Sequence, residues 1–118
     1  MTVSVNIHEA KTHLSRLLEQ VAAVHVSAAT VWELTIKTML GKLTVPADLS
    51  KRLPEQGLEL LSVTAEHAEA IRDFPELTRH DPFDRLIVAQ ASRAGLRLLT
   101  ADHVLLDLRR DFILDASR

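Results

Sequence analysis

The stretch HDPFDRLIVAQA, residues 80–91, contains the best-marked helix of the chain, and a strand-like segment follows it closely at residues 97–100. Asp81 is a strong helix N-cap, Pro82 suits the first helical position, and Gly95 lies just past the expected end. The residues between them are nearly all apolar or small, so this helix is predicted to be buried on more than one side.

Strands and helices alternate on both sides of this helix. Short apolar or alternating runs predict strands at residues 3–7, 24–26, 58–63, 97–100 and 112–114. Capping residues and helical spacing predict helices that start after Asn6, after Ser27 or Thr30, and near Ala47, Thr64 and Val104. This alternation predicts a single α/β domain whose parallel sheet is flanked by helices. Ligands in such folds bind at the carboxyl ends of the strands.

Composition narrows the possible partners. The chain has 118 residues, of which 47% are hydrophobic, with no cysteine and a net charge of −2. One hydrophobic core is feasible at this length, and a thiolate metal site is excluded. The net charge argues against a broad electrostatic surface for nucleic acid, so any such contact must be local or mediated by a metal. We see no secretion signal and no membrane span, and we expect a cytoplasmic protein.

Four acids occupy positions typical of a cation site. Each of them follows a predicted strand or lies at the start of the following helix: Glu33, Asp81, Asp84 and Asp102. In a parallel α/β layout these positions can converge at one edge of the sheet. Converging carboxylates repel one another unless a hard divalent cation neutralises them, and Mg²⁺ or Mn²⁺ is the natural candidate.

Each acid also has a simpler explanation. Asp81 and Asp84 can cap their helix and complement its dipole, and Asp102 can cap the short helix that follows it. Glu33 can pair with Lys37 one helical turn later. If the Asp81 carboxylate accepts hydrogen bonds from backbone N–H groups, Asp84 is the acid that remains free for a metal.

Four segments together resemble the PIN-domain toxins of the VapC type: VSAATVWELTIK (26–37), GKL (41–43), DPFDR (81–85) and LTAD (99–102). The resemblance covers about residues 24–118 and implies a metal-dependent ribonuclease with a PIN-like fold. It implies that Glu33, Asp84 and Asp102 bind the metal and that Asp81 is an accessory acid. The hydroxyl of Thr100 would lie beside the site, Arg85 would be structural or substrate-facing, and Trp32 is expected in the core.

The beginning of the chain departs from this family. PIN toxins open with a strand that ends in a metal-binding aspartate, and no aspartate precedes Glu33 here. Instead, residues 5–18 look like the start of a Phd/YefM-type antitoxin, which divides the chain into residues 1–23 and 24–118. Either this segment fills the missing places in the sheet, with Asn6 near the position of the absent aspartate, or it is a separate arm.

The functional hypothesis is a Mg²⁺- or Mn²⁺-dependent endoribonuclease of a toxin–antitoxin module, whose activity the missing aspartate would impair. Its partners would be an RNA substrate, a cognate antitoxin and, by the resemblance, a second copy in a homodimer. The alternative is a non-catalytic fusion or remnant that acts by binding a partner toxin or antitoxin. The six histidines are scattered along the chain and predict no zinc site.

Overall fold

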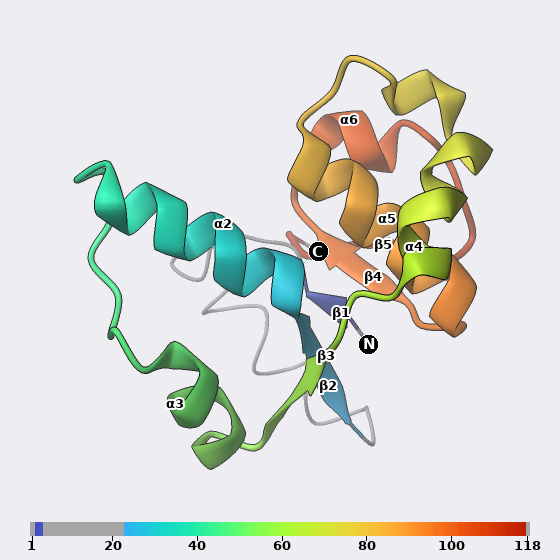
Figure 1. Cartoon of the computed structure of the whole chain (residues 1–118). Helices are drawn as coiled ribbons and strands as arrows, with labels where there is room; N and C mark the ends of the chain where they lie inside the picture. Colours follow the sequence, from blue (N-terminus) through green and yellow to red (C-terminus); the bar gives the residue numbers. More distant parts are fainter. Residues whose placement is uncertain (1, 4–22, 118) are drawn as a thin grey trace.

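Five parallel strands form one sheet in the computed structural model, which describes residues 2–3 and 23–117 (Figure 1). The strands are β1 (Thr2–Val3), β2 (Val24–Ser27), β3 (Leu58–Leu61), β4 (Leu98–Thr100) and β5 (Ile113–Asp115). Their order across the sheet is β3-β2-β1-β4-β5. The predicted α/β fold with a parallel sheet and flanking helices is confirmed, and the last predicted strand forms one edge of the sheet.

The first residues of the chain lie in the middle of this sheet. Thr2 pairs with His25 of β2 and with Leu98 of β4, and Val3 pairs with Leu99. From β1 the chain proceeds outward to β2 and β3 on one side and then to β4 and β5 on the other. The strand order therefore reverses beside β1, and such a reversal opens a crevice for ligands at the carboxyl ends of the strands.

Helix α5 (Pro82–Ala94) forms the centre of the core, as the sequence predicts. Its Asp81 N-cap, its Pro82 start and its left-handed Gly95 end are all confirmed, with Gly95 at φ 67°. Five consecutive residues, 87–91, are buried, so this helix is covered on several sides. Phe74, Leu77, Leu98 and Leu105 pack into the same apolar core and are each at most 5% exposed.

The remaining helices flank the sheet. They are α2 (Ala28–Met39), α3 (Leu49–Glu55), α4 (Ala65–Glu69) and α6 (His103–Leu106), with short 3-10 turns at Ala70–Asp73 and Pro75–Leu77. The caps predicted at Ser27 and Thr64 are present. None of the helices in the described ranges is long and apolar enough to span a membrane.

Helix α4 turns His67 rather than its alanines toward the core. Ala65 and Ala68 are exposed, whereas His67 and Ala70 are buried. The reason is a capping box in which the Thr64 N–H donates to Nδ1 of His67 at 3.1 Å. This hydrogen bond turns the His67 ring inward, and the chain tightens into a 3-10 turn directly after α4.

Arg110 is exposed and makes two contacts with a distant segment of the chain. Its guanidinium donates to Glu76 at 3.0 Å and lies 5.3 Å from the ring centroid of Phe74. Arg110 therefore ties the loop before β5 to the segment before α5 by an ion pair and a cation–π contact.

Candidate metal centre

Three helices present their N-termini to the carboxyl edge of the sheet. Helix α2 begins directly after β2, and α6 begins three residues after Thr100 at the end of β4. Helix α5 precedes β4 and runs back across the sheet, so its N-terminus lies at the same edge. Glu33, Asp84 and Asp102 lie in or next to the first turns of these helices, and the parallel topology brings them together from distant parts of the sequence.

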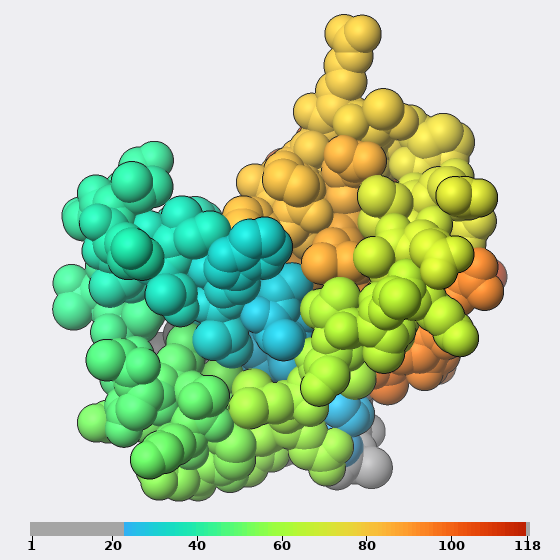
Figure 2. Space-filling model, in the orientation of Figure 1, coloured from blue at the N-terminus to red at the C-terminus, as the bar shows by residue number. Residues whose placement is uncertain are grey.

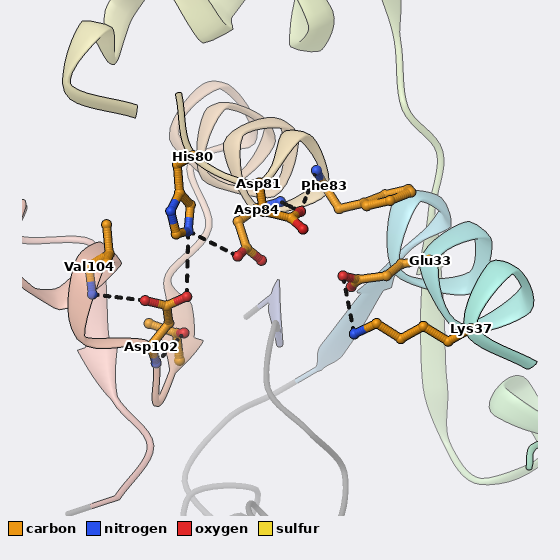
Figure 3. A network of polar contacts seen from close by, with 9 residues as sticks. Glu33, Lys37, His80, Asp81, Phe83, Asp84, Asp102 and Val104 are labelled. Atoms are coloured by element: carbon orange, nitrogen blue, oxygen red, sulfur yellow. Dashed lines mark hydrogen bonds and ion pairs between the residues drawn. The ribbon is translucent and has the colours of Figure 1, made fainter. Parts of the chain in front are cut away.

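Two of the predicted acids meet at His80. Nε2 of His80 lies 3.2 Å from Oδ2 of Asp84 and 3.5 Å from Oδ2 of Asp102. Each of the three side chains offers one possible ligand atom, and these atoms all lie within 4.8 Å of one another. Figure 3 shows one ring nitrogen of His80 facing both carboxylates, with Asp84 extending from α5 and Asp102 from the start of α6. This group, called here the three-donor group, is the candidate metal centre.

The Asp81 carboxylate caps α5, as the simpler explanation given for this residue from the sequence predicts. Its Oδ1 accepts hydrogen bonds from the N–H groups of Phe83 at 2.8 Å and Asp84 at 3.2 Å. Asp81 therefore orients the first turn of α5, where Asp84 is presented toward the metal centre. That Asp84 rather than Asp81 binds a metal stays a prediction.

Asp102 has both of the roles considered from the sequence. Its Oδ1 accepts from the Val104 N–H at 2.8 Å and caps α6, while its Oδ2 faces His80. The backbone N–H of Asp102 donates to Oγ1 of Thr100 at 3.1 Å, and Thr100 is fully buried. The Thr100 hydroxyl therefore holds the turn that presents Asp102.

The pKa of Asp84 is raised to about 6, with burial as the largest cause. The negative charges of Asp81, Asp102 and Glu33 contribute to this rise, and His80 opposes it. The other three acids proposed from the sequence thus all act on the Asp84 carboxyl. A cation placed there would relieve this repulsion, and two carboxylates with an imidazole are suitable ligands for a divalent metal.

Glu33 lies at the border of the site. Figure 3 shows its side chain extending from α2 toward the acids at the start of α5, while Lys37 approaches the same carboxylate at 3.5 Å. Glu33 is thus close enough to influence Asp84 but lies outside the three-donor group. The ion pair with Lys37 considered from the sequence is present.

Trp32 is not in the core, which corrects the sequence-based expectation. Its side chain is 59% exposed and meets the Phe83 ring edge-on, with the ring centroids 4.9 Å apart. Within α2 only Ala29 is buried, so the helix lies against the molecule without being enclosed by it. Figure 2 shows the surface hollowed between α2 and the gold-coloured segment that leads into α5. Trp32 and Phe83 join these two elements.

The sequence analysis missed His80, although its position four residues before Asp84 was a usable signal. The other predicted residues lie elsewhere. Arg85 lines a surface pocket with Arg72, Pro75 and Thr78. Asn6 and the antitoxin-like helix lie outside the residues that the structure describes.

Comparison with known proteins identifies a family. The family model of the PIN domain matches residues 4–111, including most of the segment for which an antitoxin-like origin was predicted. No curated protein matches the chain.

Solved structures share the fold at low sequence identity. A toxin–antitoxin complex from Klebsiella pneumoniae is 12% identical with a TM-score of 0.66, and 98% of each chain is covered. DNA-bound VapBC from Salmonella typhimurium is 20% identical with a TM-score of 0.64, covering 98% of this chain and 97% of that one. VapBC2 from Rickettsia felis, bound to a promoter DNA fragment, is 16% identical with the same TM-score and the same coverage.

Proposed function

This chain belongs to the PIN domain family, and we propose that it is a toxin-module protein that cleaves RNA as a metal-dependent endoribonuclease. The observation that carries the proposal is the convergence of Asp84 and Asp102 on His80, with further negative charge from Asp81 and Glu33. The structural likeness to VapBC complexes supports the toxin role, since a large part of each chain is covered.

Asp84 and Asp102 would hold a divalent ion, Mg²⁺ or Mn²⁺, with Glu33 and Asp81 as nearby acids. Such an ion orients a phosphodiester and lowers the pKa of an attacking water. Two residues of the chain position the proposed metal ligands. Asp81 fixes the start of α5, which carries Asp84, and Thr100 fixes the backbone at Asp102. At neutral pH the Asp84 carboxyl is mostly ionised despite its raised pKa of about 6, and is available as a ligand.

The substrate we propose is single-stranded RNA. The net charge of −2 gives little general attraction for a phosphate backbone, so recognition must be local. Trp32 presents an exposed ring next to Glu33, and unpaired bases stack on such rings. Arg85 is a second candidate for substrate contact, through the phosphates.

The test is cleavage of a labelled single-stranded RNA by the full chain, with Mg²⁺, with Mn²⁺ and with a chelator. Cleavage should require the metal and should be lost in Asp84→Asn. The matched control is Asp111→Asn, which makes the same chemical change at an exposed acid. Cleavage that survives both chelation and Asp84→Asn would overturn the proposal.

A second candidate function follows from the absence of an aspartate before Glu33. With one charge fewer, the site would hold the ion weakly, and the protein would act by binding a cognate antitoxin or toxin. In this version residues 1–23 are antitoxin-like and residues 24–118 form the PIN part. Asn6→Asp should then increase metal affinity if Asn6 takes the place of the absent acid, and an unchanged affinity would count against that placement.

The proposed setting is the cytoplasm, with a homodimer as the assembled form. A chain without cysteine suits a reducing compartment. Sedimentation of the full chain, alone and with a candidate antitoxin, measures both proposed assemblies. A monomer that binds no antitoxin would remove this part of the proposal.

A further inference from the structure

We propose that His80 is itself a ligand of the metal ion, through Nε2, and that its nitrogen makes the site prefer Mn²⁺ to Mg²⁺. The inference rests on the proposed metal-dependent function and specifies which ion serves it. Neither the motif that led to the acids nor the capping pattern of α5 predicted this residue as a ligand.

The spacing of the three donor atoms fits one coordination sphere. Nε2 of His80 is 3.2 Å from Asp84 Oδ2 and 3.5 Å from Asp102 Oδ2. Adjacent ligands of an octahedral ion with bonds of about 2.1 Å lie about 3.0 Å apart, and opposite ligands about 4.2 Å apart. The observed separations, all within 4.8 Å, need only small side-chain movements to reach these values.

Hydrogen bonding explains the position of the ring less well. The same nitrogen faces both carboxylates, whereas a single N–H can point well along only one of the two directions. One cation, in contrast, can lie within reach of all three atoms. His80 is only 22% exposed at its side chain, and it directly precedes the Asp81 cap, so its backbone is anchored where the ring must be held.

Because the donor atom of His80 is a nitrogen, it should increase the affinity of the site for some metal ions more than for others. Mg²⁺ takes oxygen ligands almost exclusively and keeps several waters, so an imidazole adds little to its binding. Imidazole binds first-row transition ions well, and Mn²⁺ accepts both nitrogen and carboxylate ligands. Removing the ring should therefore weaken Mn²⁺ binding much more than Mg²⁺ binding.

The experiment measures metal binding by the full chain without RNA. Titration calorimetry gives the affinities for Mn²⁺ and Mg²⁺, and pulsed electron paramagnetic resonance of bound Mn²⁺ detects a directly coordinated imidazole nitrogen. The variant is His80→Ala. The matched control is His103→Ala, which removes an exposed ring next to Asp102 that is not part of the three-donor group.

We expect His80→Ala to lower Mn²⁺ affinity at least about 10-fold, to change Mg²⁺ affinity less than about 3-fold, and to abolish the nitrogen signal. His103→Ala should leave all three unchanged. Equal losses for both ions, a gain in affinity, or a nitrogen signal that survives in His80→Ala would overturn the inference while leaving the metal site standing. Failure of the unmodified chain to bind either ion would overturn the proposed function and the inference with it.

Discussion

Replacing Asp84 with asparagine should stabilise the metal-free protein at neutral pH while abolishing its proposed activity. The Asp84 pKa is raised from 3.8 to about 6 in the folded protein, chiefly by burial and then by the neighbouring carboxylates. Folding therefore disfavours the ionised form of Asp84. This penalty is absent well below pH 3.8, where the carboxyl is protonated in both states. It is still small at about pH 4, grows between about pH 4 and 6, and is complete above about pH 7.

The magnitude follows from the pKa difference. A shift of roughly two units corresponds to about 3 kcal/mol. The Asp84 side chain retains 21% exposure, so solvent screening reduces this figure, and we expect about 1 to 2 kcal/mol. Asparagine has the same shape and no charge, so it removes the penalty. In a domain of this size, the expected rise in melting temperature is about 3 to 8 °C.

The assay is thermal and urea unfolding of the unmodified chain, Asp84→Asn and the exposed control Asp111→Asn, with chelator, at pH 7.5 and pH 4. The gain should appear only at pH 7.5 and only in Asp84→Asn. Added Mn²⁺ should then raise the stability of the unmodified chain and leave the variant unchanged. A variant that is less stable at pH 7.5, or equally stabilised at both pH values, would refute the reasoning.

Three further predictions concern the surroundings of the site. Asp81→Ala should lower the free energy of unfolding by about 1 kcal/mol through loss of the α5 cap, measured by urea unfolding; an unchanged stability would contradict this. Trp32→Ala should weaken RNA binding about 5- to 100-fold if a base stacks on the ring. Loss of the contact with Phe83 should reduce the free energy of unfolding by no more than about 1.5 kcal/mol. An unaltered RNA affinity would show that no base stacks on Trp32. Gln90→Leu should destabilise the fold by about 1 to 3 kcal/mol, because the buried Gln90 amide donates to the Ser62 carbonyl at 3.1 Å; a stable variant would show that water replaces this bond.

Several features were predictable because their signals are local. The N-cap of α5 is set by Asp81 and the residue that follows it, and the end of this helix by a glycine in the left-handed conformation. The cap of α2 at Ser27 depends on a hydrogen bond to Ala29, two residues away. Such contacts involve residues within one helical turn of each other, so the helix ends can be predicted from the sequence alone.

The errors concern which side of an element faces the core. Trp32 was expected to be buried and is exposed, because the periodicity of α2 gives a stripe of apolar residues but not how much of the molecule covers it. The buried ring of His67 was missed because its position depends on a hydrogen bond back to Thr64 and on packing against α5.

The sequence by itself determined the succession of strands and helices along the chain, the parallel α/β class and the four acids at the starts of helices. These features depend on capping, periodicity and side-chain chemistry, which are properties of short segments. Only the tertiary structure decided that Asp84 and Asp102 meet at His80, that Glu33 stays at the border, and that Thr2–Val3 lies between β2 and β4. Convergence of this kind depends on strand order, and strand order depends on how distant segments pack together to bury their apolar faces.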